Sequence, residues 1–97
     1  MLDNEIAVHH LYHRLHSSHK GKQVIINVDT LDASFAAGET VTLEKLQAMK
    51  LVPSAAGRLK VLARGLLSKP LRVEADDFSM DALKMILVTG GTPIELD

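Results

Sequence analysis

The sequence predicts one small domain of the mixed α/β (α+β) class, and two observations lead to that class. Segments that are rich in β-branched residues, or that alternate apolar and polar residues, predict strands at 23–28, 59–63 and 71–75. Apolar residues three to four positions apart predict helices around them. Strands and helices do not alternate as regular strand–helix–strand units, so an irregular arrangement is expected within the 97 residues.

The strand segments differ in how clearly they mark their two faces. The segment "QVIINV" at 23–28 reads as a short buried strand. The segment "LRVEA" at 71–75 alternates cleanly, which predicts one buried and one exposed face. The inward set is Leu71, Val73 and Ala75, and the outward set is Arg72 and Glu74.

Two short helices are expected between the first two strands. Asp29 is placed to cap a helix that runs to Phe35, and Gly38 to end it. Thr42 is placed to cap the second helix, in which Glu44 favours the positive helix start. Its expected inner face is Leu43, Leu46 and Met49, and Pro53 and Gly57 bound the loop that follows.

A third helix is expected after the strand at 71–75. Ser79 precedes "MDALKMIL" and predicts a helix cap, and Phe78 can pack on Leu83 across that cap. The double glycine Gly90–Gly91 predicts the helix end. The final strand "TPIEL" is expected at a sheet edge, because Pro93 has no backbone N–H to donate to a ladder.

Residues 1–22 are expected to form an amphipathic helix at 4–16 and a linker, ahead of a domain at 23–97. Their apolar stripe predicts packing on a second copy or on a protein partner, through Val8, Leu11, Tyr12 and Leu15. His9, His13 and His16 lie on one side of that helix, a spacing that allows two imidazoles to share a zinc or nickel ion. The same histidines also fit a solvated flank that gains charge as pH falls.

Charge is distributed in two opposed blocks, although the net charge is only −1. Residues 58–73 contain five cations and no acid, whereas 74–97 contain six acids and one lysine. Clustered cations on a strand pair can bind backbone phosphate, and the absence of interleaved aromatics disfavours base stacking. The same pattern also fits the polar face of a half-exposed sheet. The candidate RNA-binding residues are Arg58, Lys60, Arg64, Lys69 and Arg72.

Enzymatic chemistry is not indicated. Ser79 is explained as a helix cap, Asp76 and Asp77 as turn residues, and no nucleophile with a paired base is apparent. No cofactor is expected. The chain has no cysteine, no apolar run long enough to span a bilayer and no secretory signal pattern, so a cytoplasmic location is expected.

Several motifs together resemble a known family over Val24 to Leu96. They are "VIINVDTL", "FAAGETVTLEKL", "LVP", "LKVLARG", "KPLRVEADDFS" and the closing "GGTPIEL". In this order and spacing they are similar to the C-terminal domain of the bacterial large-ribosomal-subunit protein L-fifteen and its archaeal and eukaryotic relatives.

The resemblance implies an irregular superhelix of strand–strand–helix turns and a structural, non-catalytic role in binding large-subunit rRNA. It places Lys60, Arg64 and Lys69 where the family carries basic residues near rRNA. Bacterial members carry a glycine-rich basic N-terminal arm, which the five-histidine segment replaces here. The alternatives that remain are a protein-interaction or homodimerisation module on the same scaffold, and metal binding through the histidines.

Overall fold

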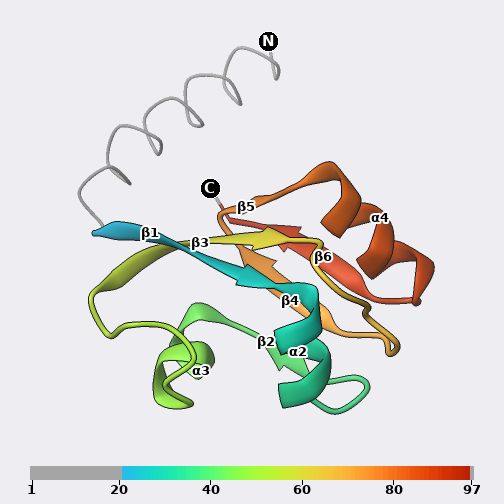
Figure 1. Cartoon of the computed structure of the whole chain (residues 1–97), viewed down its shortest axis with the longest axis horizontal. Helices are drawn as coiled ribbons and strands as arrows, with labels where there is room; N and C mark the ends of the chain where they lie inside the picture. Colours follow the sequence, from blue (N-terminus) through green and yellow to red (C-terminus); the bar gives the residue numbers. More distant parts are fainter. Residues whose placement is uncertain (1–20, 97) are drawn as a thin grey trace, which may run out of the picture.

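The computed structural model describes residues 21–96, which fold into six strands and three helices (Figure 1). In chain order these are β1 (Lys22–Asn27), α2 (Val28–Ser34), β2 (Thr40–Val41), α3 (Leu43–Ala48), β3 (Ala56–Leu62), β4 (Arg72–Ala75), β5 (Asp77–Phe78), α4 (Met80–Val88) and β6 (Thr92–Glu95). The expected helix at 4–16, with its apolar stripe, lies outside the described residues.

The strands form two parallel three-stranded sheets with the orders β1-β3-β5 and β2-β4-β6, here called sheet A and sheet B. Successive strands along the chain belong to alternate sheets, so each pair of strands makes one coil of a superhelix. Three coils stack, and neighbouring strands of parallel sheets lie about 4.8 Å apart. This arrangement confirms the mixed α/β class and the irregular superhelix that the family resemblance implied.

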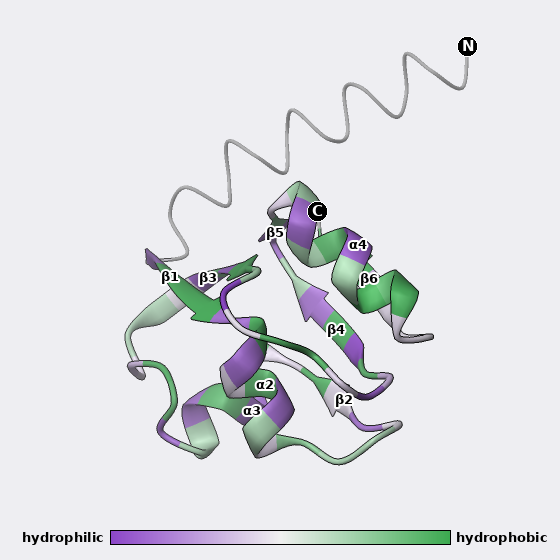
Figure 2. Ribbon diagram, turned by 45° about the vertical axis from the view of Figure 1, so that its right-hand side comes forward, coloured by the Kyte–Doolittle hydropathy of each residue, from purple (hydrophilic) through white to green (hydrophobic). Residues whose placement is uncertain are grey.

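One continuous apolar core joins the inner faces of both sheets to the three helices. In sheet B the predicted alternation of 71–75 is confirmed, because Leu71, Val73 and Ala75 are buried while Arg72 is exposed. Figure 2 shows the hydrophobic residues gathered along the strands and the inward sides of the helices. The largest fully buried side chains are Leu31, Leu46, Leu59, Leu71, Ile86, Val28, Val41, Val61 and Val73.

Two of the three expected helix caps are present. The hydroxyl of Thr42 accepts a hydrogen bond from the Lys45 amide at 3.1 Å, and that of Ser79 accepts one from the Ala82 amide at 3.1 Å. Each bond satisfies one of the amides that a helix start leaves unpaired. The Ser79 cap fixes where the chain turns from β5 into α4.

The predictions for α2 were wrong at both ends. Asn27, in the extended conformation, occupies the cap position without a side-chain bond, and Asp29 lies inside the first turn. The Asp29 amide instead donates to the carbonyl of Arg64 at 3.2 Å. The helix ends at Phe35 in extended backbone, three residues before Gly38. A contact with a distant loop, invisible in the local sequence, decides this helix start.

Other differences concern the shortest elements. The two-residue strands β2 and β5 were not predicted, because two paired residues are too few to produce a periodic pattern. Gly57 lies within β3 rather than in the preceding loop. Met49 follows the end of α3 and is exposed, so the expected inner face is reduced to Leu46, which is buried, and Leu43, which is half-buried.

The end of α4 confirms the predicted glycine stop. The Gly91 amide donates to the Ile86 carbonyl at 2.9 Å and the Gly90 amide to the Leu87 carbonyl at 3.0 Å, the two bonds of a Schellman motif. Gly90 has a φ of 86°. The chain then enters β6, which lies at the edge of sheet B as Pro93 predicted. None of the described helices is long and apolar enough to cross a membrane.

Candidate nucleic-acid interface

Strand β3 places two of the candidate cations on the outer face of sheet A. Leu59 and Val61 point into the core, so Arg58 and Lys60, which alternate with them, point outward. Both cationic side chains belong to half-buried residues. In the register of the sheet, Lys60 lies beside Ile25 of β1, which is exposed. The outer face of sheet A therefore presents two cations beside an exposed aliphatic side chain.

Lys60 has an acidic neighbour in the same sheet. Its Nζ lies 3.5 Å from Oδ2 of Asp77, which is the residue paired with it in β5. Both side chains are partly exposed, so the ion pair contributes little to stability and can exchange for another anion. Asp77 thus lowers the local positive potential, as the structural interpretation of the charge pattern expected.

Arg64 lies just after β3, at the corner where this strand meets the start of α2. Its Nε lies 3.5 Å from Oδ2 of Asp29, and most of the arginine side chain is exposed. The Asp29 amide donates to the Arg64 carbonyl, so the two residues are joined through backbone and side chain. The guanidinium is held at the surface with open faces towards solvent.

Lys69 is committed to the end of α2. Its Nζ donates to the carbonyl of Asp32 at 2.8 Å and to the carbonyl of Phe35 at 3.1 Å. These carbonyls belong to the last turn of the helix, where a cation also meets the negative end of the helix dipole. Sequence reasoning missed this role, because 34 and 37 residues separate the partners.

Ser68 strengthens the same connection from the neighbouring position. Its amide donates to Oδ1 of Asp32 at 2.8 Å, and its hydroxyl lies 2.9 Å from the same oxygen. The two hydrogen bonds from Ser68 hold the pKa of the Asp32 carboxyl below its ordinary value; desolvation opposes the shift and the nearby Lys69 adds slightly to it. Asp32, Ser68 and Lys69 together form a clasp, the "α2 clasp", between α2 and the loop before β4.

Arg72 lies on a different sheet from the other strand cations. It is exposed on the outer face of β4, where Thr40 and Thr92 are its neighbours in register. Among the described residues its guanidinium makes no ion pair. The structure therefore brings Arg58 and Lys60 together, places Arg64 beyond the end of the same strand, and separates Lys69 and Arg72 from them.

One cation near this face was missed by sequence reasoning. Lys22 begins β1, beside β3, and is exposed. The only signal for it was its position directly before a predicted strand. With Arg58, Lys60 and Arg64 it gives sheet A and its margin four cations, against Asp77 and Asp29.

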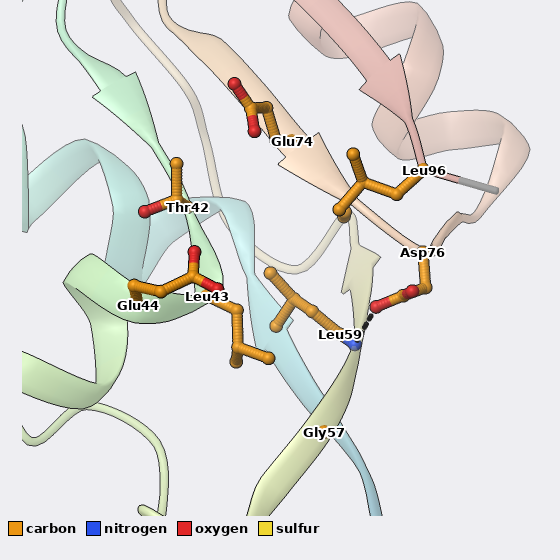
Figure 3. Close-up of a pocket in the computed structure, with 9 residues that line it drawn as sticks. Thr42, Leu43, Glu44, Gly57, Leu59, Glu74, Asp76 and Leu96 are labelled. Atoms are coloured by element: carbon orange, nitrogen blue, oxygen red, sulfur yellow. Dashed lines mark hydrogen bonds between the residues drawn. The ribbon is translucent and has the colours of Figure 1, made fainter. Parts of the chain in front are cut away.

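An acidic pocket lies where the chain passes from sheet B back to sheet A (Figure 3). It has a volume of about 260 Å³ and includes the carboxylates of Glu44, Glu74 and Asp76 in its lining. Asp76 is held there because its Oδ2 accepts a hydrogen bond from the Leu59 amide at 2.7 Å. Three acids without a cation in the lining repel phosphate, so this pocket does not belong to an RNA-binding surface.

Within residues 21–96 no group of histidine, cysteine, aspartate and glutamate side chains is arranged to hold a metal ion. The candidate ligands His9, His13 and His16 lie outside the described residues, so metal binding through them stays a prediction. Ser79, considered as a nucleophile, uses its hydroxyl as the cap of α4.

A superhelix of alternating sheet strands, with cations along one face and no catalytic constellation in the described part, is the architecture of a structural protein. The family of ribosomal proteins that comprises 50S-L15, 50S-L18e and their counterpart in the 60S subunit matches residues 25–94, and the chain belongs to that family. This confirms the resemblance inferred from the sequence motifs.

The chain is similar to several proteins named large ribosomal subunit protein uL15. It is 48% identical to that of Pelobacter propionicus over 68 residues, which cover 70% of this chain and 46% of the relative. It is 40% identical to that of Thermotoga petrophila over 67 residues, covering 69% and 46%. For Akkermansia muciniphila the identity is 38% over 71 residues, covering 73% and 47%. The chain thus matches about half the length of these relatives.

Proposed function

We propose that this protein is a structural, non-catalytic component of the large ribosomal subunit that binds rRNA in the cytoplasm. The observation that carries the proposal is membership of a ribosomal protein family across residues 25–94. The relatives' name supports it, since each is a large-subunit ribosomal protein at 38–48% identity.

The outer face of sheet A, with its margin, is the surface that we assign to rRNA. Lys22, Arg58, Lys60 and Arg64 present cations there, on rigid strands or directly next to them. The aromatic side chains of Phe35 and Phe78 are buried in the core, which leaves the described surface without a stacking platform. Contacts to phosphates and to the shape of the RNA are therefore expected, rather than stacking on bases.

The remaining two candidates divide by their contacts. Arg72 is exposed and available for an additional phosphate on the sheet B side. Lys69 holds the last carbonyls of α2, so its loss is expected to affect folding more than binding. With a net charge of −1, the long-range attraction to RNA is weak and binding depends on local cations.

Binding of purified large-subunit rRNA tests the proposal, at about 50 and about 200 mM salt. Arg58→Gln with Lys60→Gln is expected to weaken binding and to reduce the salt dependence by roughly one phosphate contact per cation. Lys84→Gln removes a cation from α4 and serves as the matched control, with unchanged affinity expected. Absence of binding by the unmodified protein at about 50 mM salt would contradict the proposal.

A further inference from the structure

Helix α4 carries an exposed apolar stripe on the side that faces away from the core. Met80 is 66% exposed, Leu87 59% and Val88 85%. Positions 80, 87 and 88 share one side of a helix because they follow the i, i+7, i+8 spacing. Ala82 and Ile86, on the opposite side, are fully buried and hold the helix against the core. We call Met80, Leu87 and Val88 the α4 stripe.

Exposed apolar residues this close together are costly for a protein that works in water, and they commonly mark an interaction site. The rigidity of α4 supports that interpretation, because its start is capped by Ser79 and its end is closed by Gly90 and Gly91. Figure 2 shows hydrophobic residues reaching the outer side of α4.

The charges around the stripe are mainly acidic. Asp81 lies in the first turn of α4 and is exposed, and Glu95 is exposed on β6, which contacts α4. The only cation on α4 is Lys84. Between 74 and 96 the chain carries five acids and one lysine, so this end of the molecule repels phosphate and attracts cations.

We infer that the α4 stripe docks a lysine- or arginine-rich protein segment that carries apolar side chains of its own. The inference goes beyond the proposed rRNA binding and concerns the acidic end of the chain, away from sheet A. Apolar side chains of the partner cover Met80, Leu87 and Val88, and its cations meet Asp81 and Glu95.

Other occupants fit less well. RNA would bring phosphates against Asp81 and Glu95, with Lys84 as the sole compensating cation on α4. A symmetric pair of copies joined through α4 would place the same acids opposite each other, because a two-fold interface repeats one surface on both sides. Addition of a strand to β6 is also disfavoured, since Pro93 lacks an N–H on this edge strand.

A labelled peptide of about 18 residues, with leucine on one helical face and lysine on the other, is a suitable probe for the full chain. Saturable binding is expected, weakened about tenfold or more by Leu87→Asp with Val88→Asp, and weakened by Asp81→Lys with Glu95→Lys. Leu66→Asp is the matched control, because Leu66 is 78% exposed in a loop outside α4. Circular dichroism verifies that each variant is folded.

Three results would overturn the inference. The first is equal binding of a peptide with glutamate in place of lysine, or equal loss of binding in Leu66→Asp. The second is a dimer in sedimentation equilibrium that dissociates on Leu87→Asp with Val88→Asp, which would make a second copy the occupant. The third is rRNA affinity that falls in that same variant, which would place RNA on the stripe. Loss of rRNA binding by Arg58→Gln with Lys60→Gln leaves the stripe unaffected, so the two proposals fail separately.

Discussion

Asp76 and Leu59 hold each other through two hydrogen bonds, although 17 positions separate them in the chain. The Leu59 amide donates to Oδ2 of Asp76 at 2.7 Å, and the Asp76 amide donates to the Leu59 carbonyl at 2.9 Å. Asp76 stands between β4 and β5, where the chain passes from sheet B to sheet A. The pair therefore ties the crossing point of the third coil to the central strand of sheet A.

Replacing Asp76 with alanine is expected to lower the free energy of unfolding by about 1–3 kcal/mol, because it leaves the amide of the fully buried Leu59 without its partner. Asp76→Asn keeps an acceptor oxygen and is expected to retain most of the stability. Urea unfolding of the three proteins measures the difference. An Asp76→Ala midpoint equal to that of the unmodified protein would show that the bond is dispensable.

The α2 clasp predicts a pH dependence of stability. The pKa of Asp32 is lowered in the folded state from its ordinary value of 3.8, so the unfolded chain takes up the proton first as pH falls. The stabilisation by the ionised carboxylate is present above the unfolded pKa and is lost as pH falls through the folded pKa. Asp32→Asn removes this titration, so the stability gap between the two proteins should narrow as pH falls below about 4.

Denaturant unfolding between about pH 2.5 and 6 measures that gap, and Ser68→Ala provides a second check. Ser68→Ala removes the hydroxyl donor but keeps the amide donor, so it is expected to weaken the pH dependence without abolishing it. A gap that stays constant over the whole range would mean that Asp32 titrates alike in both states.

Lys69→Met is expected to separate folding from binding. The change removes the ammonium from the carbonyls of Asp32 and Phe35 but keeps the length of the side chain, and should cost about 0.5–1.5 kcal/mol. The affinity of the folded variant for rRNA should remain near that of the unmodified protein. Arg58→Gln with Lys60→Gln should show the reverse pattern. A large loss of affinity in folded Lys69→Met would return Lys69 to the RNA-binding set.

The double glycine predicts two different costs. A Cβ on Gly91 would overlap the carbonyl oxygen of Leu71 and lie 2.9 Å from its nitrogen, so Gly91→Ala is expected to destabilise by about 1–3 kcal/mol or more through backbone displacement. At Gly90 the nearest atom is Cβ of Pro70 at 3.8 Å, so only the positive φ of 86° opposes alanine, at about 1–2 kcal/mol.

Thermal unfolding of the two glycine variants compares these costs. A larger loss for Gly90→Ala than for Gly91→Ala would mean that backbone conformation, rather than the close approach to Leu71, explains the pair. Stability equal to that of the unmodified protein in both variants would remove both explanations.

Local patterns were sufficient for much of this chain. Alternation predicted which residues of 71–75 are buried, a hydroxyl before an apolar run predicted the caps at Thr42 and Ser79, and Gly90–Gly91 predicted the end of α4. These features depend on contacts between residues a few positions apart, so neighbouring sequence contains the information. The combination of motifs also predicted the family, which residues 25–94 confirm.

Tertiary structure decided the remainder, because it depends on residues that are distant in sequence. The division of the strands between two sheets, the hydrogen bonds of Lys69 to α2 and those of Asp76 to Leu59 all join separate segments. The same physics separated the five cations, which are close together in the chain. Arg58 and Lys60 share a face of β3, whereas Arg72 points outward from the other sheet. Sequence determined that cations are present, and the crossing of the chain between sheets determined which of them act together.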